Sequence, residues 1–119
     1  MLNLKNGYCF DLHKFSDQCM NDLGLMKDVS NLLLKNYGGQ LNALEKALNN
    51  RDFKEVNEIS HKMRGTISAF NFSALTEDMR KLEVAAKAEN YLDMEQSWPS
   101  VKSELELLVS DVTRFIKEN

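Results

Sequence analysis

Apolar residues recur every three or four positions along most of this chain, which is the period of an amphipathic α-helix. Five segments carry that period, and each of them predicts a helix. β-Hairpins favour Asn-Gly, Asp-Gly or proline at spacings that the sequence does not provide. The pattern therefore predicts an all-α protein.

The first two predicted helices differ in length. A short helix is predicted over about residues 11–23, and Gly24 is expected to end it. A longer helix is predicted from Leu25 to Asn49. The pair Gly38-Gly39 lies in the middle of this segment, and each glycine costs a helix about 1 kcal/mol relative to alanine. The pair is expected either to kink the helix or to divide it, and the sequence leaves both outcomes open.

The third helix is predicted to begin after Asp52, a favourable N-cap residue, and to run to about Phe70. Asn71 is expected to end it, because asparagine adopts the left-handed conformation more readily than most other non-glycine residues. Ser73 is expected to cap the fourth helix. The apolar positions of that helix are Leu75, Met79, Leu82 and Ala86.

A turn near Glu89-Asn90 leads to the fifth predicted helix, in which Pro99 suits the first turn. Long amphipathic helices joined by short turns bury their apolar faces most simply in an up-down bundle. We therefore expect one domain over residues 1–119, with a four-helix bundle over about residues 25–117 and the short helix covering one end. The apolar faces are interpreted as core rather than as a cofactor site.

Charge and composition exclude several classes of function. The net charge is -3, and no segment forms the basic block that would neutralise nucleic-acid phosphates. The sequence lacks the pattern of a secretory signal and a run of about eighteen apolar residues that would span a membrane. Cys9 and Cys19 do not combine with His13 and His61 in a zinc-binding spacing. We expect a cytoplasmic monomer without a metal site, and Met1 favours a free-standing chain.

The third predicted helix places His61 on the side away from its apolar face. A helix rotates by about 100° per residue, so His61 falls roughly 150° from the mean direction of that face. The outer side also holds residues that are polar or lack a side chain, namely Lys54, Asn57, Glu58, Arg64, Gly65 and Ser68. A single exposed histidine is most simply a solvated surface residue, so its neighbours decide the interpretation.

Gly65 is the neighbour that changes the interpretation of His61. A side chain at position 65 would lean over the turn that holds His61, so glycine clears space beside the ring at a cost to the helix. Departures of this kind are typical of functional sites. Arg64 and Lys62 flank the space, which favours an anion there, most simply a phosphoryl group. Glu58 can orient the ring, although an ordinary surface carboxylate is the preferred interpretation.

The stretch His61-Lys62-Met63-Arg64-Gly65, followed by Thr66-Ile67-Ser68-Ala69, resembles the core motif of histidine-containing phosphotransfer (HPt) domains. That motif is a histidine, any residue, Leu or Met, Lys or Arg, and then Gly. Downstream, Asn71, Leu75 and Leu82-Glu83 stand where the family often has a glycine, a leucine and a Leu-Glu pair. The resemblance covers about residues 25 to 117. Two departures are Arg64, where many members have lysine, and Asn71, where glycine is common.

The resemblance implies that His61 accepts a phosphoryl group from an aspartyl phosphate on a receiver domain and passes it to another receiver. It also implies that Arg64 steadies the phosphoryl group or the receiver, and that Gly65 lets the partner approach. Lys62 and Ser68 are expected to support the phosphoryl group or the docking. The implied partners are receiver domains of response regulators or hybrid sensor kinases.

The chain has no acidic cluster beside His61 and no glycine-rich nucleotide loop. Phosphoryl transfer depends mainly on positioning and on neutralising charge. We therefore expect a phosphoryl carrier without kinase activity and without a cofactor of its own, with Mg²⁺ supplied by the partner receiver.

Candidate docking residues surround His61 on two predicted helices. Leu32-Leu33-Leu34 spans about 200° of arc, so Leu32 and Leu34 lie at the margins of the apolar face. They either contact a receiver or pack against neighbouring helices, and both interpretations stay open. Asn57 and Glu58 complete the predicted docking surface.

Two other functions fit parts of the pattern. One is an HPt-like module that binds a receiver domain or another partner without carrying phosphate, which would make His61 dispensable. The other is a small enzyme acting alone. It is disfavoured because the sequence offers no nucleophile-base pair around His13 or His61.

Overall fold

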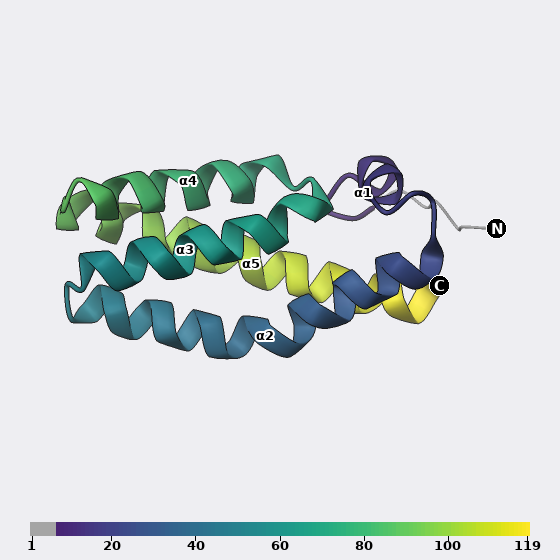
Figure 1. Ribbon diagram of the computed structural model, residues 1–119, viewed down its shortest axis with the longest axis horizontal. Helices are drawn as coiled ribbons and strands as arrows, with labels where there is room; N and C mark the ends of the chain where they lie inside the picture. The colour runs from purple at the N-terminus through teal and green to yellow at the C-terminus, as the bar shows by residue number, and fades with distance from the viewer. Residues whose placement is uncertain (1–6) are drawn as a thin grey trace.

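The computed structural model describes residues 7–119, and residues 1–6 of the predicted domain lie outside the described residues. The described part contains five α-helices, which are α1 (Leu12–Gln18), α2 (Leu23–Asn49), α3 (Phe53–Ile67), α4 (Ser73–Lys87) and α5 (Tyr91–Glu118) (Figure 1). A 3-10 helix, η1 (Ser68–Phe70), follows α3. The predicted all-α bundle with a short N-terminal helix is confirmed. No helix within residues 7–119 is long and apolar enough to cross a membrane.

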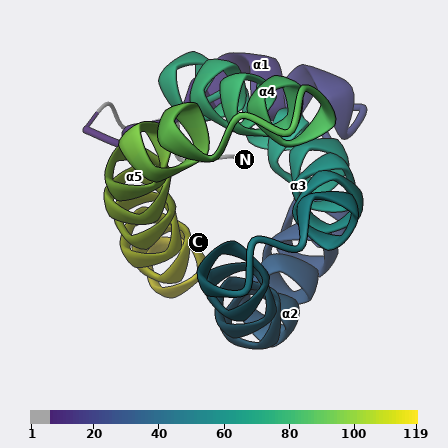
Figure 2. The ribbon, with the colours of Figure 1, turned by 90° about the vertical axis from the view of Figure 1, so that its left-hand side faces the viewer.

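Helices α2 to α5 surround a common axis when the molecule is viewed from its end (Figure 2). Helix α3 packs between α2 and α4, and α5 closes the ring by packing against both α4 and α2. Side chains that are less than 2% exposed fill the centre, among them Met26, Leu44, Met63, Leu75, Met79, Leu82, Met94 and Leu105. Each helix therefore keeps an outer side free of the core, and His61 lies on the outer side of α3.

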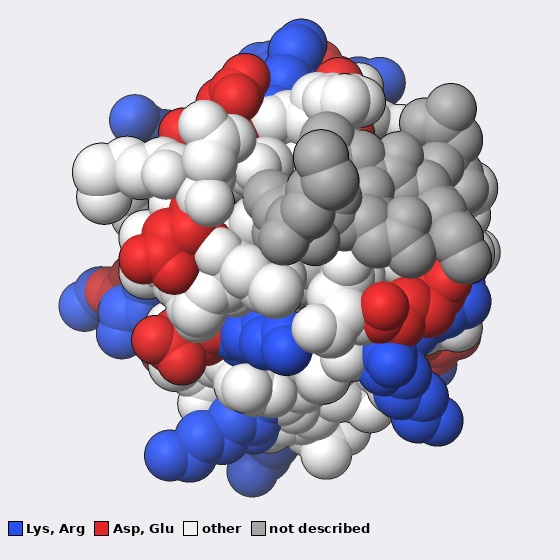
Figure 3. Space-filling view, turned by 90° about the vertical axis from the view of Figure 1, so that its right-hand side faces the viewer, with Lys and Arg blue, Asp and Glu red and all other residues white. Residues whose placement is uncertain are grey.

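Helix α1 covers one end of the bundle, beside the turn between α3 and α4 (Figure 1). An aromatic cluster holds it there: the ring centroid of Phe15 lies 4.6 Å from that of Phe70, and Phe10 lies 5.8 Å from Phe70. The Asp11 N–H donates to the carbonyl oxygen of Asn71 at 3.3 Å. Basic and acidic side chains are interspersed on this end of the molecule (Figure 3). Apolar packing, rather than a field of one charge, therefore positions α1.

The turn between α1 and α2 lies earlier in the sequence than predicted. Met20 and Asn21 adopt positive φ values of 54° and 55°. The Asp22 carboxylate then accepts the Leu25 N–H at 3.2 Å and caps α2. The prediction that Gly24 ends the first helix is wrong, because Gly24 lies in the first turn of α2, after the Asp22 cap.

Helix α2 runs without interruption through Gly38-Gly39, so the glycine pair does not divide it. A Cβ built at either glycine would meet nothing within 4 Å. The packing of α2 therefore does not require glycine at these two positions.

The predicted start and end of the third helix are confirmed. The Asp52 carboxylate accepts the Glu55 N–H at 3.2 Å, and Asn71 adopts the left-handed conformation with φ 57° and ψ 44°. The prediction that Ser73 caps α4 is wrong. Phe72 occupies the N-cap position without a side-chain hydrogen bond, and Ser73 is the first helical residue. The Phe72 side chain is buried, so α4 begins directly after a residue that is anchored in the core.

Helix α5 begins at Tyr91, eight residues before Pro99, so the prediction that Pro99 lies in its first turn is wrong. The predicted turn at Glu89-Asn90 does precede the helix. The Asn90 side chain accepts the Asp93 N–H at 3.1 Å and donates to the Asp93 carboxylate at 2.8 Å. This cap fixes the start, and Pro99 is tolerated inside the helix on its exposed side, where water can bind the carbonyl left without a donor.

One pair of carboxyl groups joins α4 to α5. Burial, followed by a hydrogen bond and charge repulsion from Asp78, raises the pKa of Glu104 from its usual 4.5 to about 7. The Oε2 atom of Glu104 is buried and has no hydrogen-bond partner. This arrangement penalises the ionised form of Glu104 in the folded protein.

Replacing Glu104 by glutamine should stabilise the protein above pH 7 and have little effect near pH 5. Between pH 4.5 and 7 the folded state binds more protons at Glu104 than the unfolded state, so the stability of the wild type falls as pH rises. Because Glu104 is only partly buried, the gain at pH 8 should be on the order of 1 kcal/mol. Urea unfolding at both pH values measures it. Glu106→Gln, an exposed change on the same helix, is the control, and an equal gain at pH 5 and pH 8 for Glu104→Gln would contradict the prediction.

Candidate functional site

Helix α3 presents His61 to solvent because its opposite side belongs to the core. Val56, Ser60, Met63 and Ile67 are buried, whereas the His61 side chain is 67% exposed. The imidazole therefore lies where the helical periodicity places it, on the outer side of the helix.

Glu83 of α4 joins His61 to Arg64. Its Oε1 atom lies 2.9 Å from His61 Nδ1, and its Oε2 atom accepts a hydrogen bond from Arg64 Nε at 2.9 Å. The Glu83 side chain is only 16% exposed, so the carboxylate is held in the seam between α3 and α4. One partly buried carboxylate thus fixes two side chains of the neighbouring helix.

The bond to Glu83 determines which nitrogen of His61 is free. A carboxylate is a hydrogen-bond acceptor, so the ring must donate its proton from Nδ1. In the neutral imidazole the lone pair then lies on Nε2, the nitrogen on the far side of the ring from Glu83. The site therefore presents a nucleophilic nitrogen to solvent with its tautomer set by a second helix.

The seam between α3 and α4 has a second polar contact close to the site. The Asn57 side-chain amide donates to the backbone carbonyl oxygen of Glu83 at 3.2 Å. This bond fixes the position of the α4 backbone against α3, one turn before His61. Asn57, predicted as a docking residue, is thus half-buried and engaged within the chain.

Gly65 lies one turn after His61 and faces open space. A Cβ added there would meet no atom within 4 Å. The Ser68 hydroxyl donates to the Gly65 carbonyl oxygen at 2.8 Å, so Ser68 lies on the same outer surface. Nothing inside the described chain requires a glycine at position 65.

Two other predicted site residues, Lys62 and Glu58, take no part in the contacts that join His61, Glu83 and Arg64. Lys62 and Glu58 are exposed, and Glu83 rather than Glu58 contacts the ring. Lys62 lies about 160° around the helix from Arg64, on the opposite flank of α3. The structure therefore brings His61, Arg64 and Gly65 together and leaves Lys62 apart.

The two candidate leucines of α2 have different environments. Leu32 is 51% exposed, whereas Leu34 is partly buried against the core. Leu34 falls about 20° from Glu45 around the helix. Glu45 forms an ion pair with Lys102 of α5, so Leu34 lies on the side of α2 that is turned away from α3.

Glu83 is the site residue that reasoning from the third helix alone does not find. The signal for it is the Leu82-Glu83 pair on the next helix, in which Leu82 is fully buried and Glu83 follows it at the edge of the core. Within residues 7–119, no group of three or more His, Cys, Asp or Glu side chains is arranged to hold a metal ion.

A family model described as Hpt domain matches residues 28–115. The chain belongs to this family, whose members are phosphocarrier modules rather than enzymes and take part in two-component phosphotransfer. Membership implies interaction with receiver domains in general. No curated protein and no solved structure matches the chain.

Replacing Glu83 by alanine should release the His61 ring. We expect ¹⁵N NMR to show mainly the Nδ1–H form of neutral His61 in the wild type and a mixture of both tautomers in Glu83→Ala. The variant also leaves the partly buried Arg64 without its carboxylate, which should lower stability by about 1 kcal/mol.

Glu77→Ala is the matched control for this experiment, because Glu77 lies on the same helix and pairs with Arg80 rather than with His61. It should leave the His61 spectrum unchanged. An unchanged tautomer in Glu83→Ala would show that the carboxylate does not orient the ring.

Proposed function

We propose that this chain carries a phosphoryl group on Nε2 of His61, taken from the aspartyl phosphate of one receiver domain and passed to another. The observation that carries the proposal is the bond between Glu83 and His61 Nδ1, on a ring that is two-thirds exposed. Membership of the Hpt family supplies the reaction class. The contact between Glu83 and Nδ1 supports Nε2 as the atom that reacts.

The transfer step needs no proton from solvent. The lone pair on His61 Nε2 attacks the phosphorus, the Nε2–P bond forms, and the bond between phosphorus and the aspartyl oxygen breaks. The aspartate leaves as a carboxylate. In the reverse step an aspartate of the second receiver attacks the phosphorus, and Nε2 leaves with its lone pair.

Glu83 acts on the charge that develops in this step. Phosphorylation at Nε2 of a ring that keeps its Nδ1 proton gives the imidazole a positive charge. The Glu83 carboxylate, 2.9 Å from Nδ1, stabilises that charge through a charge-assisted hydrogen bond. Because Glu83 is mostly shielded from water, this stabilisation is larger than an exposed carboxylate would provide.

Arg64 can contribute without leaving Glu83. A guanidinium has five N–H donors, and the described contacts of Arg64 use its Nε. The remaining donors can bind a phosphoryl oxygen beside His61. Mg²⁺ is assigned to the partner receiver, whose own carboxylates would hold it.

His61→Gln should abolish labelling while the protein stays folded. The label transferred from a receiver charged with acetyl phosphate should be acid-labile and comparatively base-stable, as expected for phosphohistidine. With phosphoramidate as a small-molecule donor, His13→Gln should retain full labelling, which identifies the reactive histidine. Circular dichroism checks the fold of both variants.

Full labelling of His61→Gln would refute the proposal. A wild-type protein that binds receivers tightly but accepts no label would instead favour the module that binds without carrying phosphate.

Substitutions at Gly65 should separate stability from transfer. Gly65→Ala should raise the free energy of unfolding by about 1 kcal/mol, because the position is helical and a Cβ meets nothing. Gly65→Gln should slow transfer from a receiver by on the order of 100-fold, since displacing the reacting atoms by about 1 Å can cost that much. Labelling by phosphoramidate should change little in either variant.

Gly38→Ala is the matched control, because Gly38 is also helical with nothing within 4 Å. It falls about 20° from Glu45 around α2 and therefore faces α5 rather than α3. It should gain stability with no loss of transfer. Wild-type transfer in Gly65→Gln would show that the receiver does not approach over this glycine.

A further inference from the structure

Three polar contacts join α3 to Glu83, and all of them come from one stripe of α3. Asn57, His61 and Arg64 lie within about 60° of one another around the helix. His61 and Arg64 bind the two carboxylate oxygens, whereas the Asn57 side-chain amide donates to the Glu83 backbone carbonyl oxygen at 3.2 Å. That oxygen has two lone pairs, so it can accept Asn57 besides the hydrogen bond of its own helix. Asn57 therefore acts on the backbone that carries the carboxylate.

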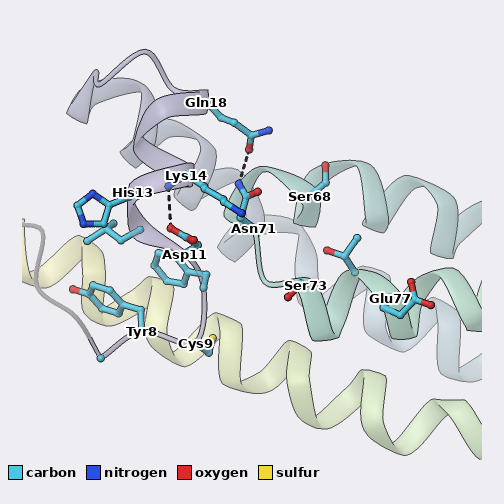
Figure 4. A pocket seen from close by; sticks show the side chains of 14 residues that line it. Tyr8, Cys9, Asp11, His13, Lys14, Gln18, Ser68, Asn71, Ser73 and Glu77 are labelled. Carbon is cyan, nitrogen blue, oxygen red and sulfur yellow. Dashed lines mark hydrogen bonds between the residues drawn. The ribbon is translucent and has the colours of Figure 1, made fainter.

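The register of α4 along α3 is also held at the turn between them, beside a hollow at the α1 end of the bundle (Figure 4). There the Asn71 side-chain amide donates to Gln18 at 2.9 Å, and the Asp11 N–H donates to the Asn71 carbonyl oxygen at 3.3 Å. Glu83 lies ten residues after Ser73, the first residue of α4, and therefore roughly 15 Å from this turn. Over that distance a tilt of α4 by about 4° would displace Glu83 by roughly 1 Å. A second anchor close to Glu83 is needed to hold it more precisely.

The two helices carry small buried residues next to this second anchor. Ser60 follows Asn57 by three residues and is 0% exposed, and Ala86 follows Glu83 by three residues and is 1% exposed. The distance between packed helices depends on the side chains at their contact, so small residues permit a close approach. The Ser60 hydroxyl donates to the carbonyl oxygens of Val56 and Asn57, at 2.6 and 3.2 Å, so it needs no partner on α4. The short Asn57 side chain can therefore reach the backbone of α4.

We infer that Asn57 is a positioning residue for phosphoryl transfer, because its bond to the Glu83 backbone sets where the carboxylate meets His61 Nδ1. The inference rests on the proposed function and gives Asn57 a role within the chain. A docking residue would act only when a receiver is the donor. A positioning residue acts with every phosphoryl donor, so the two roles can be separated by experiment.

Replacing Asn57 by leucine, which has a similar size and no donor, should loosen the His61 ring. ¹⁵N NMR of the unphosphorylated protein should show a smaller share of the Nδ1–H tautomer than in the wild type. Labelling by phosphoramidate and transfer from a charged receiver should slow by the same factor, roughly two- to tenfold, since one hydrogen bond is lost.

Ile67→Val is the matched control for loss of stability. Ile67 is buried on the same helix, so the variant loses buried apolar contacts without touching Glu83. It should leave the tautomer ratio and both rates unchanged. Circular dichroism checks that every variant is folded under the conditions of the assay.

Combining Asn57→Leu with Glu83→Ala tests whether Asn57 acts through Glu83. If it does, Asn57→Leu should slow labelling by phosphoramidate no further once the carboxylate is absent. An equal slowing with and without the carboxylate would show that the effect of Asn57 does not pass through Glu83, and would overturn the inference.

The two phosphoryl donors separate the remaining outcomes. A wild-type tautomer ratio and wild-type labelling by phosphoramidate in Asn57→Leu would overturn the positioning role, and slower transfer from the receiver alone would make Asn57 a docking residue instead. A wild type that accepts no phosphate from either donor would overturn the proposed function. The tautomer ratio, which is measured without phosphate, would still show whether Asn57 holds Glu83 against the ring.

Discussion

The Glu83 carboxylate is the contact on which the site at His61 depends. Its two oxygens engage two side chains of α3, each at 2.9 Å, from a position that is largely shielded from water. The ring of an exposed histidine would otherwise sample several rotamers and both tautomers. Arg64 helps to hold the Glu83 carboxylate in place. Its positive charge balances that of Glu83, which allows a carboxylate to lie in the seam between two helices.

This contact requires a fixed register between α3 and α4, and the short connection between them supplies it. Asn71 reverses the chain in the left-handed conformation, and Phe70 and Phe72 on either side of it are buried. Asn57 then ties the two helices together at the carbonyl of Glu83. Helix α1 packs on the same connection through Phe15. The helix outside the bundle thus stabilises the turn on which the geometry of the site depends.

The sequence was sufficient to predict what depends on periodicity and on local capping. The five helices, the Asp52 cap, the stop at Asn71 and the outward direction of His61 follow from the pattern of a single segment. The three wrong helix boundaries, at Gly24, Ser73 and Pro99, have a common cause. Each was predicted from the general preference of that residue type for helix ends, whereas competing caps and buried neighbours decide the observed boundaries. The bond from Glu83 to His61 was beyond such reasoning, because it depends on the register of two helices across a turn.

Packing within the described chain does not explain why position 65 is a glycine. Open space alone does not distinguish it, because Gly38 and Gly39 also have nothing within 4 Å of a built Cβ. What distinguishes Gly65 is its place one turn after an exposed ring whose other nitrogen is bound to Glu83. A missing side chain lowers helix stability wherever it occurs. Under the proposed function, the constraint that favours glycine at this position comes from the receiver that approaches Nε2.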